Sequence, residues 1–240
     1  MIIPLFPVSN TFRDESASAM LPRMALKQLA PPAAPILTQD VAYQQLRLDS
    51  TLGVSPRSRP DDQLITDAAW AATEELDARN GWLGRALTEQ RWQLSLPRFP
   101  HGPILLPFPP LISIESVVYI DAITGNDVTL APGTGYRLGD EDEVAYIRPP
   151  YAARWPNSRE ENGSIRIAYT CGYGTDPDSV PRQIRQYAKM RLGFYYENRE
   201  TTVLERGVTV QDEFGFLPGM LENFRVRGVF RPWSPPGADG

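Results

Sequence analysis

The stretch Thr88-Glu89-Gln90-Arg91-Trp92-Gln93-Leu94-Ser95-Leu96 decides the fold class. Its apolar residues Trp92, Leu94 and Leu96 alternate with polar ones, which is typical of a strand that buries one face. The residues before it repeat their apolar positions at helical spacing instead. The sequence therefore predicts that the chain changes from helix to strand at about residue 88.

A series of short strands is expected beyond this point. Residues 112–120 are rich in β-branched side chains, and residues 165–169 alternate again. Turn-forming residues separate the segments, as in Thr124-Gly125-Asn126-Asp127. We expect a compact antiparallel β module over residues 88–174, with its further strands at 104–106, 112–120, 128–130, 136–138, 144–147 and 165–169.

Helices are expected on both sides of this module. Thr38 is a good N-cap for a short helix that ends near Leu48, and Pro60-Asp61-Asp62 opens a second one. Asn80-Gly81 is expected to stop the second helix through its tolerance of left-handed backbone. Asp178-Ser179-Val180-Pro181 starts a closing helix, and residues 218–224 suit a further short one. An apolar stripe in the second helix is formed by Leu64, Ile65, Ala68, Ala69, Ala72 and Leu76. One face of the closing helix carries Ile184, Tyr187, Ala188, Arg191, Leu192 and Tyr195.

The predicted fold is α+β, a small helical bundle with an inserted antiparallel β module and extended N- and C-terminal arms. Proline makes up 24 of 240 residues, and it collects in loops and arms because it lacks a backbone donor. We divide the chain into an N-terminal arm (1–37), helical core (38–87), β module (88–174), closing helix (175–200) and C-terminal docking segment and tail (201–240). Within the first arm, residues 18–29 suggest a short helical piece.

Composition argues against several classes of protein. The net charge of −5 does not suit a protein whose main task is to neutralise DNA phosphates. One cysteine allows no disulfide within the chain. No apolar stretch approaches the length of about 18 residues that a membrane-spanning helix needs. We expect neither a membrane partner nor a phosphate-driven DNA binder.

No set of residues in the sequence suggests catalysis. His101 is the only histidine and lies in a loop flanked by proline and glycine; it could act as a base only if neighbours positioned it, and we interpret it as an ordinary loop residue. Cys171 is interpreted as a small core residue. The acidic run 140–143 lacks the spaced ligands of a calcium loop and is interpreted as a solvated turn. A glycine-rich phosphate loop is missing as well. We expect no enzyme activity, no metal and no cofactor.

The C-terminal segment is the best candidate for a contact with a partner. Arginine and aromatic residues, which often dominate the binding energy of interfaces, gather in Phe224-Arg225-Val226-Arg227-Gly228-Val229-Phe230-Arg231-Pro232-Trp233. The alternation from Phe224 onward also suits an added strand at a partner's sheet edge. The alternative is a last strand or helix of the chain's own core. The candidate docking residues are Arg225, Arg227, Phe230, Arg231 and Trp233.

Several stretches, in this order, resemble the head-tail connector family of tailed bacteriophages, also called adaptor or head-completion proteins. The resemblance spans about residues 38–200. It rests on Asn80-Gly81-Trp82-Leu83-Gly84-Arg85-Ala86-Leu87, Gln90-Arg91-Trp92-Gln93-Leu94-Ser95-Leu96-Pro97-Arg98-Phe99-Pro100, Ile104-Leu105-Leu106-Pro107-Phe108-Pro109-Pro110-Leu111, Ile114-Glu115-Ser116-Val117-Val118-Tyr119-Ile120-Asp121, Trp155-Pro156, Ile165-Arg166-Ile167-Ala168-Tyr169, Gly172-Tyr173-Gly174, Val180-Pro181 and Tyr195-Tyr196-Glu197-Asn198-Arg199-Glu200.

The resemblance implies a structural subunit of the virion neck. Family members form a ring with themselves, usually a dodecamer, under the portal protein. The ring extends the channel through which genomic DNA passes without sequence-specific binding, and it carries the next component, a stopper or tail-completion protein. In relatives the C-terminal segment engages the portal. The single cysteine, which allows no disulfide within the chain, fits assembly in the host cytoplasm.

Two alternatives remain open at the level of the sequence. The chain could be another neck or tail protein, such as a stopper or tail terminator. It could also be a β-rich module that binds carbohydrate or a receptor through an exposed aromatic platform around Tyr151 and Trp155.

Overall fold

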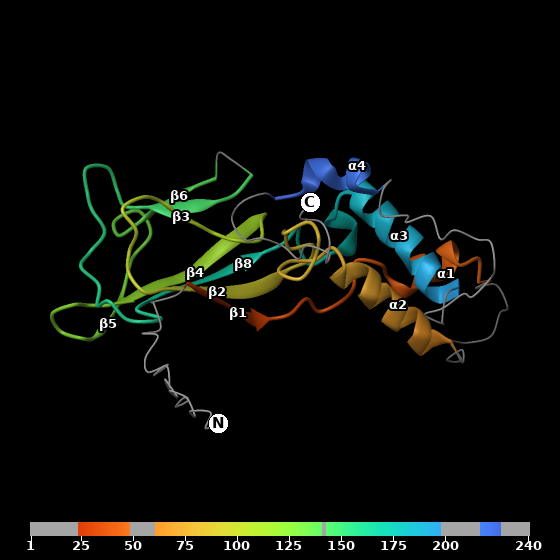
Figure 1. Cartoon of the computed structure of the whole chain (residues 1–240), viewed down its shortest axis with the longest axis horizontal. Coiled ribbons are helices and arrows are strands. Elements are labelled where there is room, and N and C mark those ends of the chain that lie inside the picture. Colours follow the sequence, from red (N-terminus) through yellow and green to blue (C-terminus); the bar gives the residue numbers. More distant parts are fainter. Residues whose placement is uncertain (1–23, 49–60, 141–142, 198–216, 227–240) are drawn as a thin grey trace, which may run out of the picture.

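The computed structural model of the chain describes residues 24–48, 61–140, 143–197 and 217–226. The molecule is elongated, with its β-sheets at one end and its helices at the other (Figure 1). This confirms the α+β class and the antiparallel β module.

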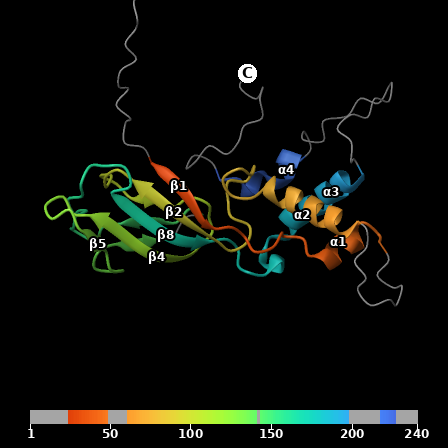
Figure 2. The same ribbon diagram turned by 90° about the horizontal axis from the view of Figure 1, so that it is seen from below.

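The larger sheet has five antiparallel strands in the order β1-β2-β8-β4-β5, which can be followed across Figure 2. The predicted alternation in β2 is confirmed, because Trp92, Leu94 and Leu96 are buried. In β8, Ile167 lies directly across from Leu94 and is buried with it. The strands are β1 (Ala25–Ala30), β2 (Gln90–Leu96), β4 (Leu111–Ile120), β5 (Asp127–Thr129) and β8 (Ile165–Cys171).

A smaller sheet covers one face of the larger one. Its order is β3-β7-β6, from β3 (Ile104–Leu105), β7 (Tyr146–Arg148) and β6 (Arg137–Gly139). Side chains from both sheets form one buried apolar cluster, which holds the β module together by excluding water. Its members include Trp92, Leu94, Ile104, Leu106, Phe108, Val117, Tyr119, Tyr136, Ile147, Ile165, Ile167, Tyr169 and Cys171.

The edge strand β1 contradicts the sequence prediction. The helical piece expected over residues 18–29 is wrong for Ala25–Ala30, which pair with β2 in antiparallel register, Leu26 opposite Leu94. Alanine, leucine, lysine and glutamine all favour helix, but the free edge of β2 supplies backbone hydrogen bonds that override this local preference. The sheet therefore takes a strand from residues that precede the helices, and the β module is more than an insertion.

The helical half consists of α1 (Gln39–Gln45), α2 (Asp62–Glu74), α3 (Arg182–Glu197) and α4 (Leu217–Leu221). The predicted start of α1 is confirmed, since the Thr38 hydroxyl accepts from the Val41 N–H at 3.5 Å. The expected faces of α2 and α3 pack together. The buried residues of this second core include Ile36, Leu37, Ala42, Ile65, Ala68, Ala69, Ala72, Leu76, Leu83, Leu87, Val180, Ile184, Tyr187, Ala188, Leu192 and Leu221.

Gly81 has a different role from the one expected. Helix α2 ends at Glu74, before Asn80-Gly81, and Gly81 does not have positive φ. A Cβ at Gly81 would lie 2.1 Å from the carbonyl carbon of Leu76. Glycine is needed here because two backbone segments approach closely as the chain turns back along the end of α2.

Candidate functional site

Residues 217–226 of the predicted docking segment fold onto the chain's own helical core. Helix α4 is followed by a 3-10 turn, η3 (Glu222–Phe224), and then by extended backbone. Leu221 and Val226 are buried, and the Val226 N–H donates to the Leu83 carbonyl at 2.9 Å. For residues 217–226, the alternative of a last element of the core is therefore correct.

Arg85 fixes this segment to the rest of the molecule. Its Nε donates to the Phe224 carbonyl at 2.6 Å, its Nη1 donates to the Tyr173 hydroxyl at 2.8 Å, and its Nη2 pairs with the Glu143 carboxylate. The Arg85 side chain is 4% exposed, whereas that of Glu143 is 53% exposed. Burial raises the pKa of Tyr173, while the Arg85 charge acts against this. One guanidinium thus joins the C-terminal segment, the end of β8 and the loop before β7.

Arg225 is the only candidate docking residue that the structure describes. Its guanidinium carbon lies 4.7 Å from the centre of the Trp82 ring, a cation–π contact within the chain. Trp82 and Arg225 are both half-buried. Arg227, Phe230, Arg231 and Trp233 lie outside the described residues, so their portal-docking role stays a prediction.

A second buried arginine joins the two long helices. Arg191 of α3 pairs with Glu75 at the end of α2 at 2.7 Å. The hydroxyls of Tyr187 and Tyr195 donate to the same carboxylate at 3.1 and 3.2 Å. Burial, followed by the Glu75 charge, raises the pKa of both tyrosines. The three donors occupy both oxygens of the Glu75 carboxylate, which therefore ties α3 to the end of α2.

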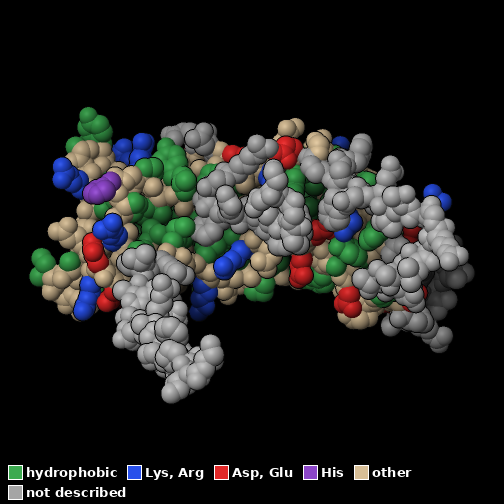
Figure 3. Space-filling model, viewed as in Figure 1, with side chains coloured by type: hydrophobic (Ala, Val, Ile, Leu, Met, Phe, Trp, Pro, Cys, Tyr) green, Lys and Arg blue, Asp and Glu red, His purple; other side chains and the backbone are tan. Residues whose placement is uncertain are grey.

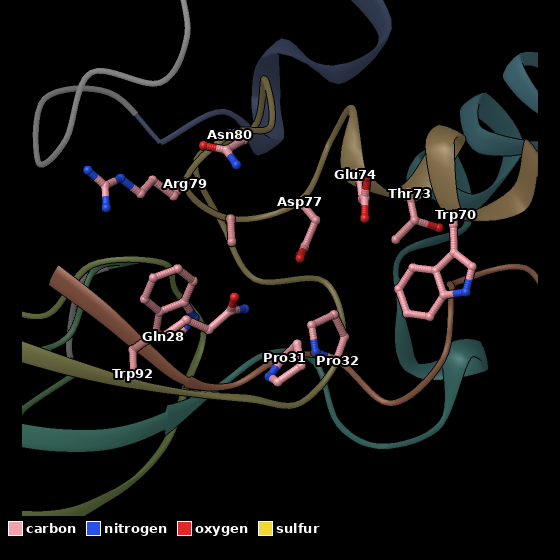
Figure 4. A pocket seen from close by; sticks show the side chains of 11 residues that line it. Gln28, Pro31, Pro32, Trp70, Thr73, Glu74, Asp77, Arg79, Asn80 and Trp92 are labelled. Atoms are coloured by element: carbon pink, nitrogen blue, oxygen red, sulfur yellow. The ribbon is translucent and has the colours of Figure 1, made fainter. Parts of the chain in front are cut away.

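The described residues contain a pocket of about 510 Å³ at the junction of the two halves (Figure 4). Trp70 of α2 and Trp92 of β2 are on its wall, together with Pro31 and Pro32 from the link between β1 and α1. Asp77 lies at its side, where its carboxylate accepts from the Leu87 N–H at 2.8 Å and from the Gln90 amide. Burial raises the pKa of Asp77 to about 6 in spite of these donors. The pocket's other polar lining residues are Gln28, Thr73, Glu74, Arg79 and Asn80.

The histidine and the cysteine are not brought into a catalytic arrangement. His101 is exposed in the loop before β3, at the β end of the molecule (Figure 3). Cys171 is fully buried at the end of β8, and burial raises the pKa of its thiol, which disfavours the reactive thiolate. Cys171 is thus the core residue that the sequence indicated.

The aromatic platform expected for a carbohydrate-binding module is incomplete. Tyr151 is 93% exposed. Trp155, however, stacks on Phe99 with ring centres 4.7 Å apart, and its indole N–H donates to the Gly102 carbonyl at 3.3 Å. Since Trp155 packs partly against the β core, Tyr151 and Trp155 do not present two free ring faces.

Two other kinds of site have no support among the described residues. No group of three or more histidine, cysteine, aspartate or glutamate side chains among them could hold a metal ion. None of the described helices is long and apolar enough to cross a membrane.

Solved structures with the same fold come from gene transfer agent particles. A chain from the virion of a native particle superposes with a TM-score of 0.63 at 19% identity, covering 85% of this chain and 97% of that one. A chain from the neck of an empty particle, computed with C6 symmetry, gives 0.63 at 21% identity, with 86% and 97% covered. A chain from the neck of a native particle, computed with C12 symmetry, gives 0.54 at 19% identity. The chain shares their fold. No protein-family model and no curated protein matches it.

The role of Arg85 in positioning the C-terminal segment was not predicted from the sequence. The sequence did contain a signal, because Arg85 stands among Leu83, Ala86 and Leu87, all of them fully buried. A charged residue in such a run is almost always paired. Its partners, at positions 143, 173 and 224, could not be found from the sequence because they are 58 to 139 residues away.

Proposed function

We propose that the chain is a structural subunit of the neck of a tailed-phage-like particle, and that it forms a ring there as the head-tail adaptor. The observation that carries this proposal is the shared fold, which takes in 97% of the neck chains as well as most of this one. The C6 and C12 symmetries of those necks support a ring of repeated subunits.

The finer assignments belong to the same proposal. The ring docks under the portal, extends the channel for genomic DNA, and carries a stopper or tail-completion protein on its other side. It resides in the virion neck and is assembled in the host cytoplasm. The net charge of −5 suits a channel through which DNA slides, since basic contacts to phosphate would retain it. The role is structural rather than catalytic.

The experiment is to mix the purified protein with DNA-filled, portal-bearing heads from the same genome and to image their necks. An added ring under the portal is the expected result. Heads that stay unchanged, or protein found only at the tail tip, would contradict the adaptor role. Density at the far side of a ring already present would instead favour a stopper or tail terminator.

The portal-docking role of the C-terminal segment needs a truncation that spares the helical core. A stop after Val226 removes Arg227, Phe230, Arg231 and Trp233 but keeps the contacts of Val226 and Phe224. The expected result is a folded subunit that no longer attaches to heads. Attachment equal to that of the full-length chain would show that residues 227–240 are not the docking arm.

A further inference from the structure

The outward face of α2 is acidic with one aromatic residue at its centre. The helix buries Ile65, Ala68, Ala69, Ala72 and Thr73. Asp67, Trp70 and Glu74 follow one another on the opposite face at spacings of three and four residues. Asp67 and Glu74 are exposed, and the described residues place no lysine or arginine within ion-pair distance of either. Trp70 is half-buried and lines the pocket.

The outward face of α3 is basic and apolar. This helix buries Ile184, Tyr187, Ala188, Arg191 and Leu192. Met190, which is 45% exposed, lies on the opposite face, whereas Phe194, which is 38% exposed, lies at its edge with the Arg191 guanidinium carbon 5.0 Å from its ring centre. Gly193 lies next to Met190 on this face, and a Cβ there would meet no atom within 4 Å. The face is therefore flat enough for close approach of another molecule.

Two cations on this face also have no acidic partner among the described residues. Arg185 pairs with Asp178, and Arg191 pairs with Glu75. Arg182 and Lys189, which are seven residues apart, have no acidic partner among the described residues. Asp67 and Glu74 of α2 are seven residues apart too, so each pair spans about 10 Å at a rise of about 1.5 Å per residue. Equal spacing lets both pairs form at once.

The two faces look away from each other. Helices α2 and α3 are neighbours (Figure 1) and bury one side of each in a common core, so the sides turned away from that core lie on opposite flanks of the helical half. Unlike faces on opposite flanks of one subunit form a head-to-tail contact, which closes into a ring when the rotation allows. A self-complementary contact would need the same face on both copies.

We propose that the α3 face of one copy binds the α2 face of the next, with Arg182 and Lys189 opposite Asp67 and Glu74, Trp70 between these two charge pairs, and Met190 at the end of the charged stretch. This interface rests on the ring of the proposed function and assigns the surfaces that build it. The aromatic and apolar contacts supply most of the affinity, and the charge pairs set the register and disfavour two like faces meeting.

The test is crosslinking of the full-length chain through two introduced cysteines, in a Cys171→Ala background. Ala71→Cys and Gly193→Cys mark the two faces and leave Trp70, Met190 and Phe194 in place. A short bismaleimide linker is expected to produce a ladder of dimers, trimers and larger products. The matched control is Ala71→Cys with Ile123→Cys, since Ile123 is 90% exposed at the β end. If crosslinked products form no faster than in the control variant, the proposal is refuted.

Chains with one cysteine each test the polarity of the contact. The Ala71→Cys chain mixed with the Gly193→Cys chain is expected to give only mixed dimers. Dimers of the Ala71→Cys chain with itself, at the same yield, would show a symmetric contact and overturn the head-to-tail arrangement.

Charge exchange tests the register. Asp67→Lys with Glu74→Lys in the two-cysteine chain is expected to slow the ladder at least about fivefold. Adding Arg182→Glu and Lys189→Glu to the same chain is expected to restore it. No recovery would place the charges outside the contact. If rings form on portal-bearing heads but no crosslinked ladder appears, this interface is refuted and the adaptor proposal stands. If the ladder appears but no ring forms on the neck, the interface stands and the adaptor proposal is refuted.

Discussion

Single buried side chains tie distant parts of this chain together. Arg85 contacts residues from the loop before β7, the end of β8 and the C-terminal segment, although its own neighbours in sequence are apolar. A buried guanidinium stabilises a fold only when its donors are satisfied, because an unpaired charge in the interior is costly. The position of residues 221–226 therefore depends on one side chain more than 130 residues earlier.

Replacing Arg85 by methionine is expected to lower the free energy of unfolding by about 2–4 kcal/mol, since the Phe224 carbonyl and the Tyr173 hydroxyl lose a charged donor. Urea unfolding measures the loss, and faster amide exchange over residues 221–226 should accompany it. The control is Glu143→Gln, expected to cost less than about 1 kcal/mol because Glu143 is half exposed. If both variants lose the same free energy of unfolding, the contribution of Arg85 to stability comes from its ion pair with Glu143 alone.

The raised pKa of Asp77 predicts an unusual dependence of stability on pH. In the unfolded chain its carboxyl titrates at the ordinary pKa of 3.8, and in the folded chain at about 6. Between about pH 4 and 6 the folded chain keeps a proton that the unfolded chain has released. The free energy of unfolding therefore falls as the pH rises through this window, by about 3 kcal/mol in total. Most aspartates behave in the opposite way.

The measurement for Asp77 compares the wild type with Asp77→Asn in urea unfolding from pH 3.5 to 7. The difference between the two curves removes the contribution of all other groups. The variant is expected to gain stability relative to the wild type as the pH rises through the window. Parallel curves would contradict a raised pKa at Asp77.

At the scale of elements, β1 shows how a tertiary partner overrides local preference. The composition of residues 25–30 favours helix, yet the strand lies along β2 with Leu26 buried and Leu29 exposed. By contrast β2, β8, α2 and α3 form where their periodicity predicted them. Their patterns are strong because each buries one complete face, whereas β1 at the sheet edge buries a single leucine.

Leu26 and Leu29 distinguish a strand from a helix at this position. Three residues apart, they would share one face of a helix and should then respond alike to truncation. In the strand, Leu26→Ala is expected to cost about 2 kcal/mol, since Leu26 is 9% exposed. Leu29→Ala, at 39% exposure, should cost less than about 0.5 kcal/mol. Thermal and urea unfolding of the two variants would measure the difference, and equal costs would refute the strand.

At the scale of the whole molecule, the helical half is completed by the C-terminal segment. A stop after Asn223 removes Phe224, Arg225 and Val226, while a stop after Val226 keeps them. The shorter chain is expected to be less stable than the longer one by about 2–3 kcal/mol. It loses the buried Val226 side chain, the bond from its N–H to Leu83 and the carbonyl that accepts from Arg85.

Differential scanning calorimetry of the two truncated chains measures the contribution of residues 224–226 to stability. The comparison also separates stability from docking, because a stop after Asn223 would confuse a damaged core with a missing arm. Equal melting temperatures would mean that residues 224–226 do not stabilise the helical half.

The candidate site was only partly predictable. The sequence pointed to the C-terminal segment as a surface for a partner, and its arginine and aromatic content is evident without coordinates. The sequence left open whether α4 and Val226 pack on the chain's own core. A short apolar run can pack equally well on that core or on the surface of a partner. The opposed faces of α2 and α3 emerged only when both helices were placed, because a helical pattern shows which side is polar but not which neighbour it faces.

The sequence by itself determined the order of helical and strand segments from residue 38 onward, the N-cap at Thr38 and the burial of Cys171, because these depend on periodicity and on residues within a few positions. Only the tertiary structure decided that residues 25–30 are a strand, that Arg85 holds Phe224 and that α2 and α3 turn unlike faces outward. Each of these depends on partners tens of residues away, and such contacts are selected by the burial and hydrogen bonding of the complete fold rather than by any local pattern.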